Sequence, residues 1–174
     1  MMVRETYRAL VPRFAPALFL VVSAALLLTV YLFQHVGGLE PCPLCVAQRY
    51  PHFAVLGLGL VALLFGQRVP WLMTGLLAAI ATAYLTGAGY AAFHVGVEAG
   101  YFRSACAGAG GGTGSIEELR QRILNAPLAR CDDVPWTLLG LSMAGWNGIL
   151  GVVLGLAALY AAVLALCDSR KRVR

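Results

Sequence analysis

Two cysteines separated by two residues, Cys42 and Cys45, are the residues of this sequence best suited to chemistry. They stand in the stretch EPCPLCVAQRYPHF, where Pro43 follows the first cysteine. Proline fits the first position of a helix, because the amide that it lacks would be unpaired there anyway. Cys42 would then be the N-cap and Cys45 would lie in the first turn, where free amides and the helix dipole stabilise a thiolate. The pattern indicates thiol–disulfide exchange.

Stapling and metal binding are the competing uses of such a pair. A bridge between Cys42 and Cys45 closes so small a loop that it restrains the unfolded chain little. Zinc sites normally have four ligands, and His35 and His52 do not stand at finger-like spacing from the cysteines. We therefore expect no metal here.

Arg49 lies four residues after Cys45, so its guanidinium can reach back towards that sulfur or towards an anion held above it. The alternative is that it extends to the lipid headgroups. Pro51 lacks an amide donor and is expected to kink the helix and open space near the cysteines. Three neighbouring side chains are interpreted as membrane-interface residues: Tyr50, His52 and Phe53.

The elements that must position these residues are membrane helices. Of the 174 residues, 60% are hydrophobic and 12% are charged, about half the charged share of a soluble domain. Four uncharged runs of 26, 18, 29 and 34 residues can each hold a helix that crosses the bilayer. The sequence predicts one domain over residues 1–174, an all-α bundle with spans near 14–36, 45–65, 71–93 and 145–167, and with a loop over 94–144.

Basic residues near the ends of the spans predict the orientation. Under the four-span arrangement, eight of them fall on the side of both termini: Arg4, Arg8, Arg13, Arg68, Arg170, Lys171, Arg172 and Arg174. That side is expected to be cytoplasmic, with both termini inside. The basic tail SRKRVR serves the same purpose, so we expect contact with membrane lipid and none with nucleic acid.

The five cysteines divide between the two sides. Cys42, Cys45, Cys106 and Cys131 fall on the non-cytoplasmic side, where thiols can be held oxidised, and Cys167 falls at the other end of the last span. Proximity favours the pairs Cys42–Cys45 and Cys106–Cys131, although four cysteines allow three connectivities. Taken alone, the second pair is typical of a structural staple.

The long loop is predicted to contain a short amphipathic helix in SIEELRQRIL. Ser115 and Glu118 match a capping box, and apolar residues recur at helical spacing behind them. The helix could lie in the membrane surface or pack on the bundle.

A reduced cysteine pair at a membrane boundary needs an acceptor for two electrons. Apolar helices and an arginine flank the pair, which suits a lipid-soluble molecule with a polar ring, a quinone.

The sequence resembles the DsbB family of bacterial disulfide-forming membrane proteins over nearly its whole length. The resemblance rests on PCPLCVAQR at the second span, AFHVGVEAGYF leaving the third, PWTLLGLSMAGWN entering the fourth, and the ordered pair Cys106 and Cys131. It implies a bacterial inner-membrane enzyme, a quinone-dependent oxidase of protein dithiols. Its partner would be a periplasmic DsbA-type thioredoxin-fold protein, and its acceptor ubiquinone or menaquinone.

The resemblance also implies roles for individual residues. Cys106 would form the mixed disulfide with the partner, and Cys131 would then attack Cys42 and free Cys45 beside the quinone. Arg49 and His94 would lie at the quinone. Gln48 stands where an acidic residue can occur in the family.

Three rival interpretations remain at this point. A protein similar to vitamin K epoxide reductase would place its pair at the start of the last span, whereas Cys42 and Cys45 open the second. A structural four-span protein with a stapled loop would tolerate Cys42→Ser. A metal-handling protein would lose its metal on alkylation of the pair.

Overall fold

The computed structural model describes residues 2–107, 115–124 and 129–173. Its elements are α1 (Met2–His35), α2 (Pro43–Ala47), α3 (Arg49–Val61), the π-helical turn η1 (Ala62–Gly66), α4 (Pro70–Glu98), α5 (Ile116–Leu124), β1 (Thr137–Leu138), β2 (Leu141–Ser142) and α6 (Met143–Val173). The two strands form a small antiparallel hairpin that the sequence did not reveal. The predicted all-α architecture with four membrane helices is confirmed.

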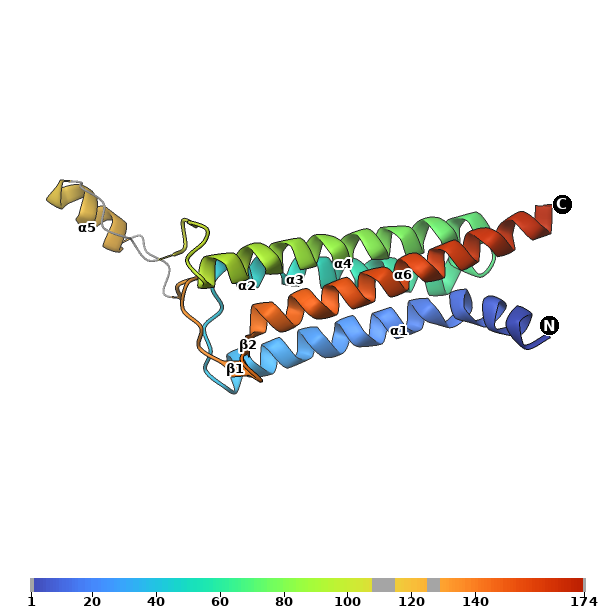
Figure 1. The fold of residues 1–174 in the computed structure, drawn as a ribbon, viewed down its shortest axis with the longest axis horizontal. Coiled ribbons are helices and arrows are strands. Elements are labelled where there is room, and N and C mark those ends of the chain that lie inside the picture. Colours follow the sequence, from blue (N-terminus) through green and yellow to red (C-terminus); the bar gives the residue numbers. More distant parts are fainter. Residues whose placement is uncertain (1, 108–114, 125–128, 174) are drawn as a thin grey trace.

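Four segments are long and apolar enough to cross a membrane: Leu10–His35, Pro43–Gly66, Pro70–Glu98 and Met143–Lys171. They run side by side in one elongated bundle, with the N- and C-termini at the same end (Figure 1). Each overlaps one of the expected spans. α4 continues to Glu98, so His94 lies in the helix and not in the loop that was expected to begin there. The helix ends where Gly100 adopts a positive φ of 76°, which glycine allows without strain.

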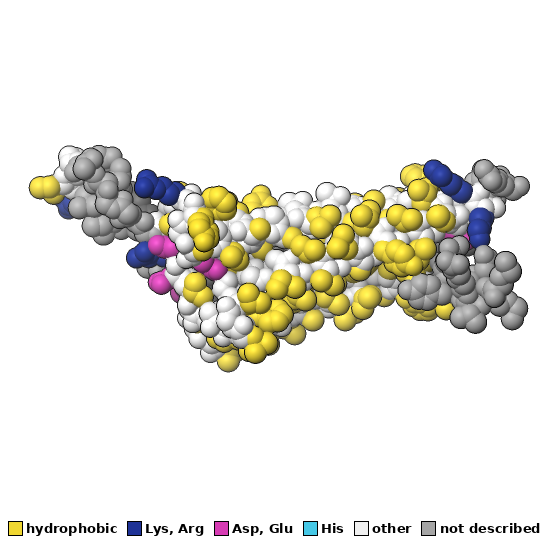
Figure 2. Space-filling model, viewed as in Figure 1, with side chains coloured by type: hydrophobic (Ala, Val, Ile, Leu, Met, Phe, Trp, Pro, Cys, Tyr) yellow, Lys and Arg dark blue, Asp and Glu magenta, His cyan; other side chains and the backbone are white. Residues whose placement is uncertain are grey.

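The surface of the bundle is suited to lipid. Figure 2 shows hydrophobic side chains along its length and charged side chains at its two ends. Large apolar side chains such as Leu18, Val21, Val153 and Leu156 are more than half exposed. Such a surface would be an aggregation liability in water, whereas the hydrocarbon core of a bilayer accepts it.

Small residues set the approach of α4 to α6. A Cβ atom on Gly151 would lie 3.1 Å from both the Ala88 side chain and the Tyr84 carbonyl oxygen. The expected role of small residues in close helix packing holds here. It does not hold at Gly75, which is exposed and has no atom within 4 Å of such a Cβ position.

The second span is interrupted at Gln48, between α2 and α3. Pro51 has no amide hydrogen for the Ala47 carbonyl, so the regular hydrogen-bond ladder cannot pass this point. Pro51 packs instead against Gly87 of α4. The expected disturbance of the helix is present, close to the cysteines.

The predicted loop helix is α5, which begins directly after Ser115. The side chains of Glu118, Leu119 and Ile123 lie outside the described part of the structure. α5 lies beyond the end of the bundle that carries α2 (Figure 1).

Candidate functional site

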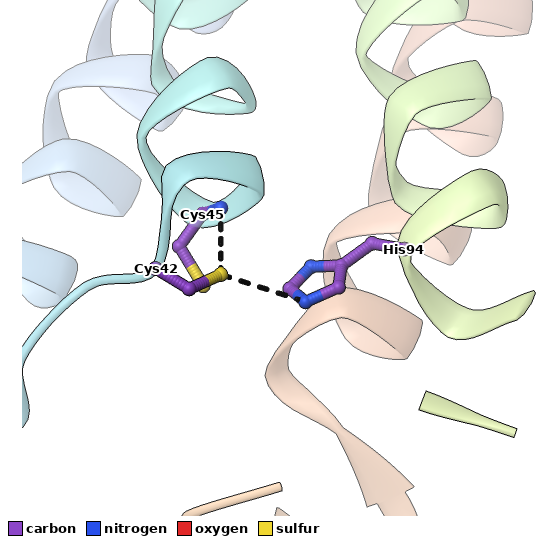
Figure 3. A group of neighbouring side chains, drawn as sticks. All are labelled: Cys42, Cys45 and His94. Carbon is purple, nitrogen blue, oxygen red and sulfur yellow. Dashed lines mark hydrogen bonds between the residues drawn. The ribbon is translucent and has the colours of Figure 1, made fainter. Parts of the chain in front are cut away.

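The thiol pair is positioned by the start of α2. Cys42 is the N-cap residue, with extended backbone angles, and Pro43 occupies the first turn. The Cys45 amide donates a hydrogen bond to Cys42 Sγ over 3.2 Å (Figure 3). The capping arrangement predicted from the spacing is therefore confirmed.

Cys42 is set up to carry the negative charge of the pair. The two sulfur atoms lie 2.9 Å apart, within hydrogen-bond reach, and His94 Nε2 lies 3.6 Å from Cys42 Sγ (Figure 3). The hydrogen bond with the Cys45 side chain, aided by His94 and the Cys45 amide, lowers the pKa of Cys42 well below that of a free thiol, although burial opposes the shift. The reduced pair thus holds its thiolate at Cys42 and its thiol proton at Cys45.

The second pair is joined. Cys106 and Cys131 form a disulfide, which is the pairing that proximity favoured, whereas Cys42 and Cys45 are free thiols. The loop disulfide packs in one buried cluster with Cys42 and Val97. The fold therefore brings together two cysteine pairs that are more than 60 residues apart in sequence.

His94 lies between the two pairs. Its Nε2 atom is 3.1 Å from the Cys131 carbonyl oxygen as well as 3.6 Å from Cys42 Sγ. On the other side of the ring, Nδ1 is 2.8 Å from Gln48 Nε2. Glu98 lies one turn further along α4, with its carboxylate 3.8 Å from His94 Nε2. His94 thus contacts both cysteine pairs: the helix pair, Cys42 and Cys45, through the Cys42 sulfur, and the loop pair, Cys106 and Cys131, through the Cys131 carbonyl.

Arg49 takes a different direction from the one expected. Its Nη1 donates to Gln34 Oε1 of α1 over 2.9 Å, and its guanidinium carbon lies 4.9 Å from the centre of the Tyr31 ring. The guanidinium is therefore anchored to α1 instead of turning back to the Cys45 sulfur. It still borders the same cavity as the thiol pair.

A cavity of about 280 Å³ opens beside the pair. Cys42, Cys45, Arg49 and His94 line it together with His52 and Asn147, and aliphatic residues of α1 such as Leu26 and Val30 form its wall. About 150 Å³ is enough for a benzene molecule, so a ring-sized ligand fits. The walls offer apolar contact, and the polar side chains offer hydrogen-bond donors.

Three of these side chains could also hold a metal ion. Ligand atoms of Cys42, Cys45 and His94 lie within 4.8 Å of one another. Neither His35 nor His52 belongs to this group. The third donor is His94, which α4 brings to the pair, and the spacing of residues in the sequence does not reveal that contact.

Residues that sequence reasoning missed surround the pair. His52 was interpreted as an interface residue, which is wrong: it is 8% exposed and hydrogen-bonds to Ser23 and Asn147. Gln48 is buried as well and bonds to His94 and Asn147. One signal was available, because Cys45, Gln48 and His52 recur at helical spacing and so share one face.

A thiol pair whose Cys42 is buried beside a loop disulfide, on a four-helix membrane bundle, is the arrangement of a membrane protein that exchanges disulfides. Comparison with known proteins agrees. The profile of the family described as "Disulfide bond formation protein DsbB" matches residues 12–161. The chain belongs to this family, and it is a multi-pass membrane protein of disulfide bond formation.

Individual relatives cover most of the chain. A Disulfide bond formation protein B from Marinobacter nauticus is 35% identical over an alignment of 158 positions, and the alignment covers 80% of this chain and 86% of the relative. Proteins of the same name from Paracidovorax citrulli and Verminephrobacter eiseniae are each 31% identical, over 159 and 175 residues. These alignments cover 85% of both chains for the former and 92% of both for the latter.

Proposed function

We propose that this protein oxidises the dithiol of a DsbA-type thioredoxin-fold partner and passes the two electrons to a quinone of the bacterial inner membrane. The observation that carries the proposal is the buried cluster of Cys42, Cys106 and Cys131, with His94 touching both pairs. Such a cluster suits disulfide exchange, since a thiolate at one pair needs access to a sulfur of the other.

Four thiol–disulfide exchanges would transfer one disulfide from the Cys42–Cys45 pair to the partner. A partner thiolate attacks Cys106 and forms a mixed disulfide, which releases the Cys131 thiolate. Cys131 attacks Cys42 of an oxidised Cys42–Cys45 bridge and frees Cys45. The second partner thiol then attacks its own mixed-disulfide sulfur, and Cys106 resolves the Cys131–Cys42 bond. The partner leaves oxidised, the loop disulfide is restored, and the helix pair holds two electrons. The arrangement of bonds in the structure, with the loop pair joined and the helix pair free, matches this last stage.

The cavity beside the pair fits a quinone in size and in donors. Arg49 and His94 would hold its ring, with aliphatic residues of α1 against its apolar part. A quinone bound there would supply an acceptor for two electrons and two protons, so that Cys42 and Cys45 could close again to a disulfide. In this proposal the cysteines face the periplasm and both termini face the cytoplasm, in agreement with the basic residues near the termini.

Quinol formation by the purified protein tests the proposal. The protein in detergent is supplied with a reduced thioredoxin-fold dithiol protein and a soluble quinone analogue, and quinone absorbance is followed. We expect turnover in the wild type and none in Cys45→Ser. Cys167→Ser serves as the matched control, because Cys167 is exposed and far along α6. Absence of turnover in the wild type, or equal turnover in Cys45→Ser, refutes the proposal.

A further inference from the structure

A chain of buried and partly buried hydrogen bonds runs from Cys42 into the bundle. Its members come from all four spans: Ser23 on α1, Gln48 and His52 on the second span, Tyr84 and His94 on α4, and Asn147 on α6. Among the described residues, no buried side-chain nitrogen or oxygen lacks a partner. Polar side chains at membrane depth are costly and point to function.

The amides of Gln48 and Asn147 determine the protonation of His94. Gln48 Nε2 faces His94 Nδ1 at 2.8 Å, while Gln48 Oε1 accepts from Asn147 Nδ2 over 2.7 Å. An amide nitrogen only donates, so His94 Nδ1 must accept, and the ring hydrogen lies on Nε2 towards Cys42. With the Gln48 amide in this orientation, a second proton on His94 Nδ1 would face an N–H group, so protonation there requires the amide to turn.

His52 has no such restriction. Its Nε2 donates to Asn147 Oδ1 over 3.1 Å, but its Nδ1 faces the Ser23 hydroxyl at 3.3 Å. A hydroxyl can donate or accept, and Ser23 is also 2.8 Å from the Tyr84 hydroxyl, which lies 3.2 Å from the Phe19 carbonyl oxygen.

Both protonation states of His52 are satisfied without movement of a heavy atom. When Nδ1 is bare, Tyr84 donates to Ser23 and Ser23 donates to Nδ1. When Nδ1 carries a proton, it donates to Ser23, Ser23 donates to Tyr84, and Tyr84 donates to the Phe19 carbonyl. The hydrogen bonds around His52 thus accommodate either protonation state of its ring.

In the proposed function, quinone reduction needs one proton that the Cys42–Cys45 pair does not supply. Reduction of a quinone to a quinol consumes two electrons and two protons. The helix pair, held as one thiolate and one thiol, gives two electrons and one proton when it closes to a disulfide. A second proton donor is therefore needed. Tyr84 is the titratable side chain packed on the His52 ring in the described structure, and other ionisable groups line the cavity around the cysteines: Glu40, Arg49, His94, Glu98, Arg130 and Asp133.

We propose that His52 takes up a proton from the aqueous phase and holds it as an imidazolium with both ring nitrogens protonated. As the Cys42–Cys45 pair closes to its disulfide, this imidazolium would give one proton to the quinone in the cavity and return to the neutral ring. His52 lines the cavity with Cys45, and it is buried among the spans, whereas Glu40, Arg130 and Asp133 of the cavity wall lie on loops. This inference rests on the proposed function, although the protonation of His52 is measurable without it.

Nitrogen NMR of histidine-labelled protein in the reduced state tests the inference directly. The chain has three histidines, which single substitutions assign. We expect His52 to become doubly protonated as the pH falls from 9 to 5, while His94 keeps a bare Nδ1. Ser23→Ala removes the acceptor for the protonated Nδ1 and should lower the charged fraction of His52 about tenfold at a given pH, and Ser23→Thr should restore it. Gln48→Glu offers only acceptors, so it should move the extra proton to His94. A His52 ring that stays neutral throughout overturns the inference.

Quinol formation separates this inference from the proposed function. In single turnovers from the reduced protein, the wild-type rate should fall with rising pH as His52 loses its proton. His52→Gln should be slower and should lose that dependence. Failure of the wild type to reduce quinone refutes the proposed function, whereas an unchanged pH profile in an active His52→Gln refutes only the role of His52.

Discussion

Replacing His94 with alanine is expected to raise the pKa of Cys42. Cys42 Sγ is within hydrogen-bond reach of the Cys45 thiol at 2.9 Å, the Cys45 amide at 3.2 Å and His94 Nε2 at 3.6 Å. The variant removes the last of these. A hydrogen bond to a charged group contributes roughly 1.5–3 kcal/mol, and the lower end applies because the contact is long and two donors remain. About 1.4 kcal/mol corresponds to a factor of ten in an equilibrium constant. At a pH below the pKa of Cys42, the thiolate fraction should therefore be about tenfold lower in His94→Ala than in the wild type.

The rate at which iodoacetamide labels Cys42, followed by mass spectrometry of the reduced protein from pH 3 to 9, measures this change, because the range extends below the Cys42 pKa of about 4. Only the thiolate reacts, so labelling falls as the pH drops through the pKa of Cys42. A raised pKa moves that fall to higher pH, and the rate on the acidic limb, relative to its alkaline plateau, should be about tenfold lower in His94→Ala. His35→Ala is the control, because His35 is exposed at the end of α1 and stacks on Tyr31. An unchanged profile in His94→Ala, or an equal change in His35→Ala, would refute the reasoning.

Two further predictions concern the cavity and the packing. Arg49→Ala should raise the apparent KM for a soluble quinone about tenfold, because a charged hydrogen-bond donor is lost, and Arg49→Lys should raise it less. Steady-state kinetics measure this change. An unchanged KM in Arg49→Ala would show that Arg49 does not bind the quinone. Gly151→Val should destabilise the bundle by about 1–3 kcal/mol, because its side chain would overlap Ala88 and the Tyr84 carbonyl. Its thermal midpoint in detergent should drop, whereas Gly75→Val, which faces open space, should leave the midpoint near the wild-type value.

The sequence was informative where the structure depends on local chemistry. Cys42, Pro43 and Cys45 specify a helix start by themselves, because capping involves only neighbouring residues. Long uncharged runs likewise predict membrane helices without knowledge of their partners.

The sequence was less informative where the structure depends on how the helices are rotated against one another. The Arg49 guanidinium lies against Gln34 and Tyr31 of α1, and His52 bonds to Asn147, 95 residues away. Hydropathy does not determine these contacts, because helices surrounded by lipid are apolar on most of their faces. Small residues and buried hydrogen bonds orient the helices instead, and their partners become visible only when the helices are placed side by side.

The burial of the loop disulfide affects which thiols in the surrounding solution can react with it. Cys131 has no exposed surface and Cys106 is 7% exposed, so dissolved low-molecular-weight thiols have little access to either sulfur. Small thiols should therefore reduce the Cys106–Cys131 disulfide slowly. A partner that exchanges with this disulfide must bind so that the Cys106 sulfur becomes accessible, and its selectivity then comes from shielding as well as from recognition.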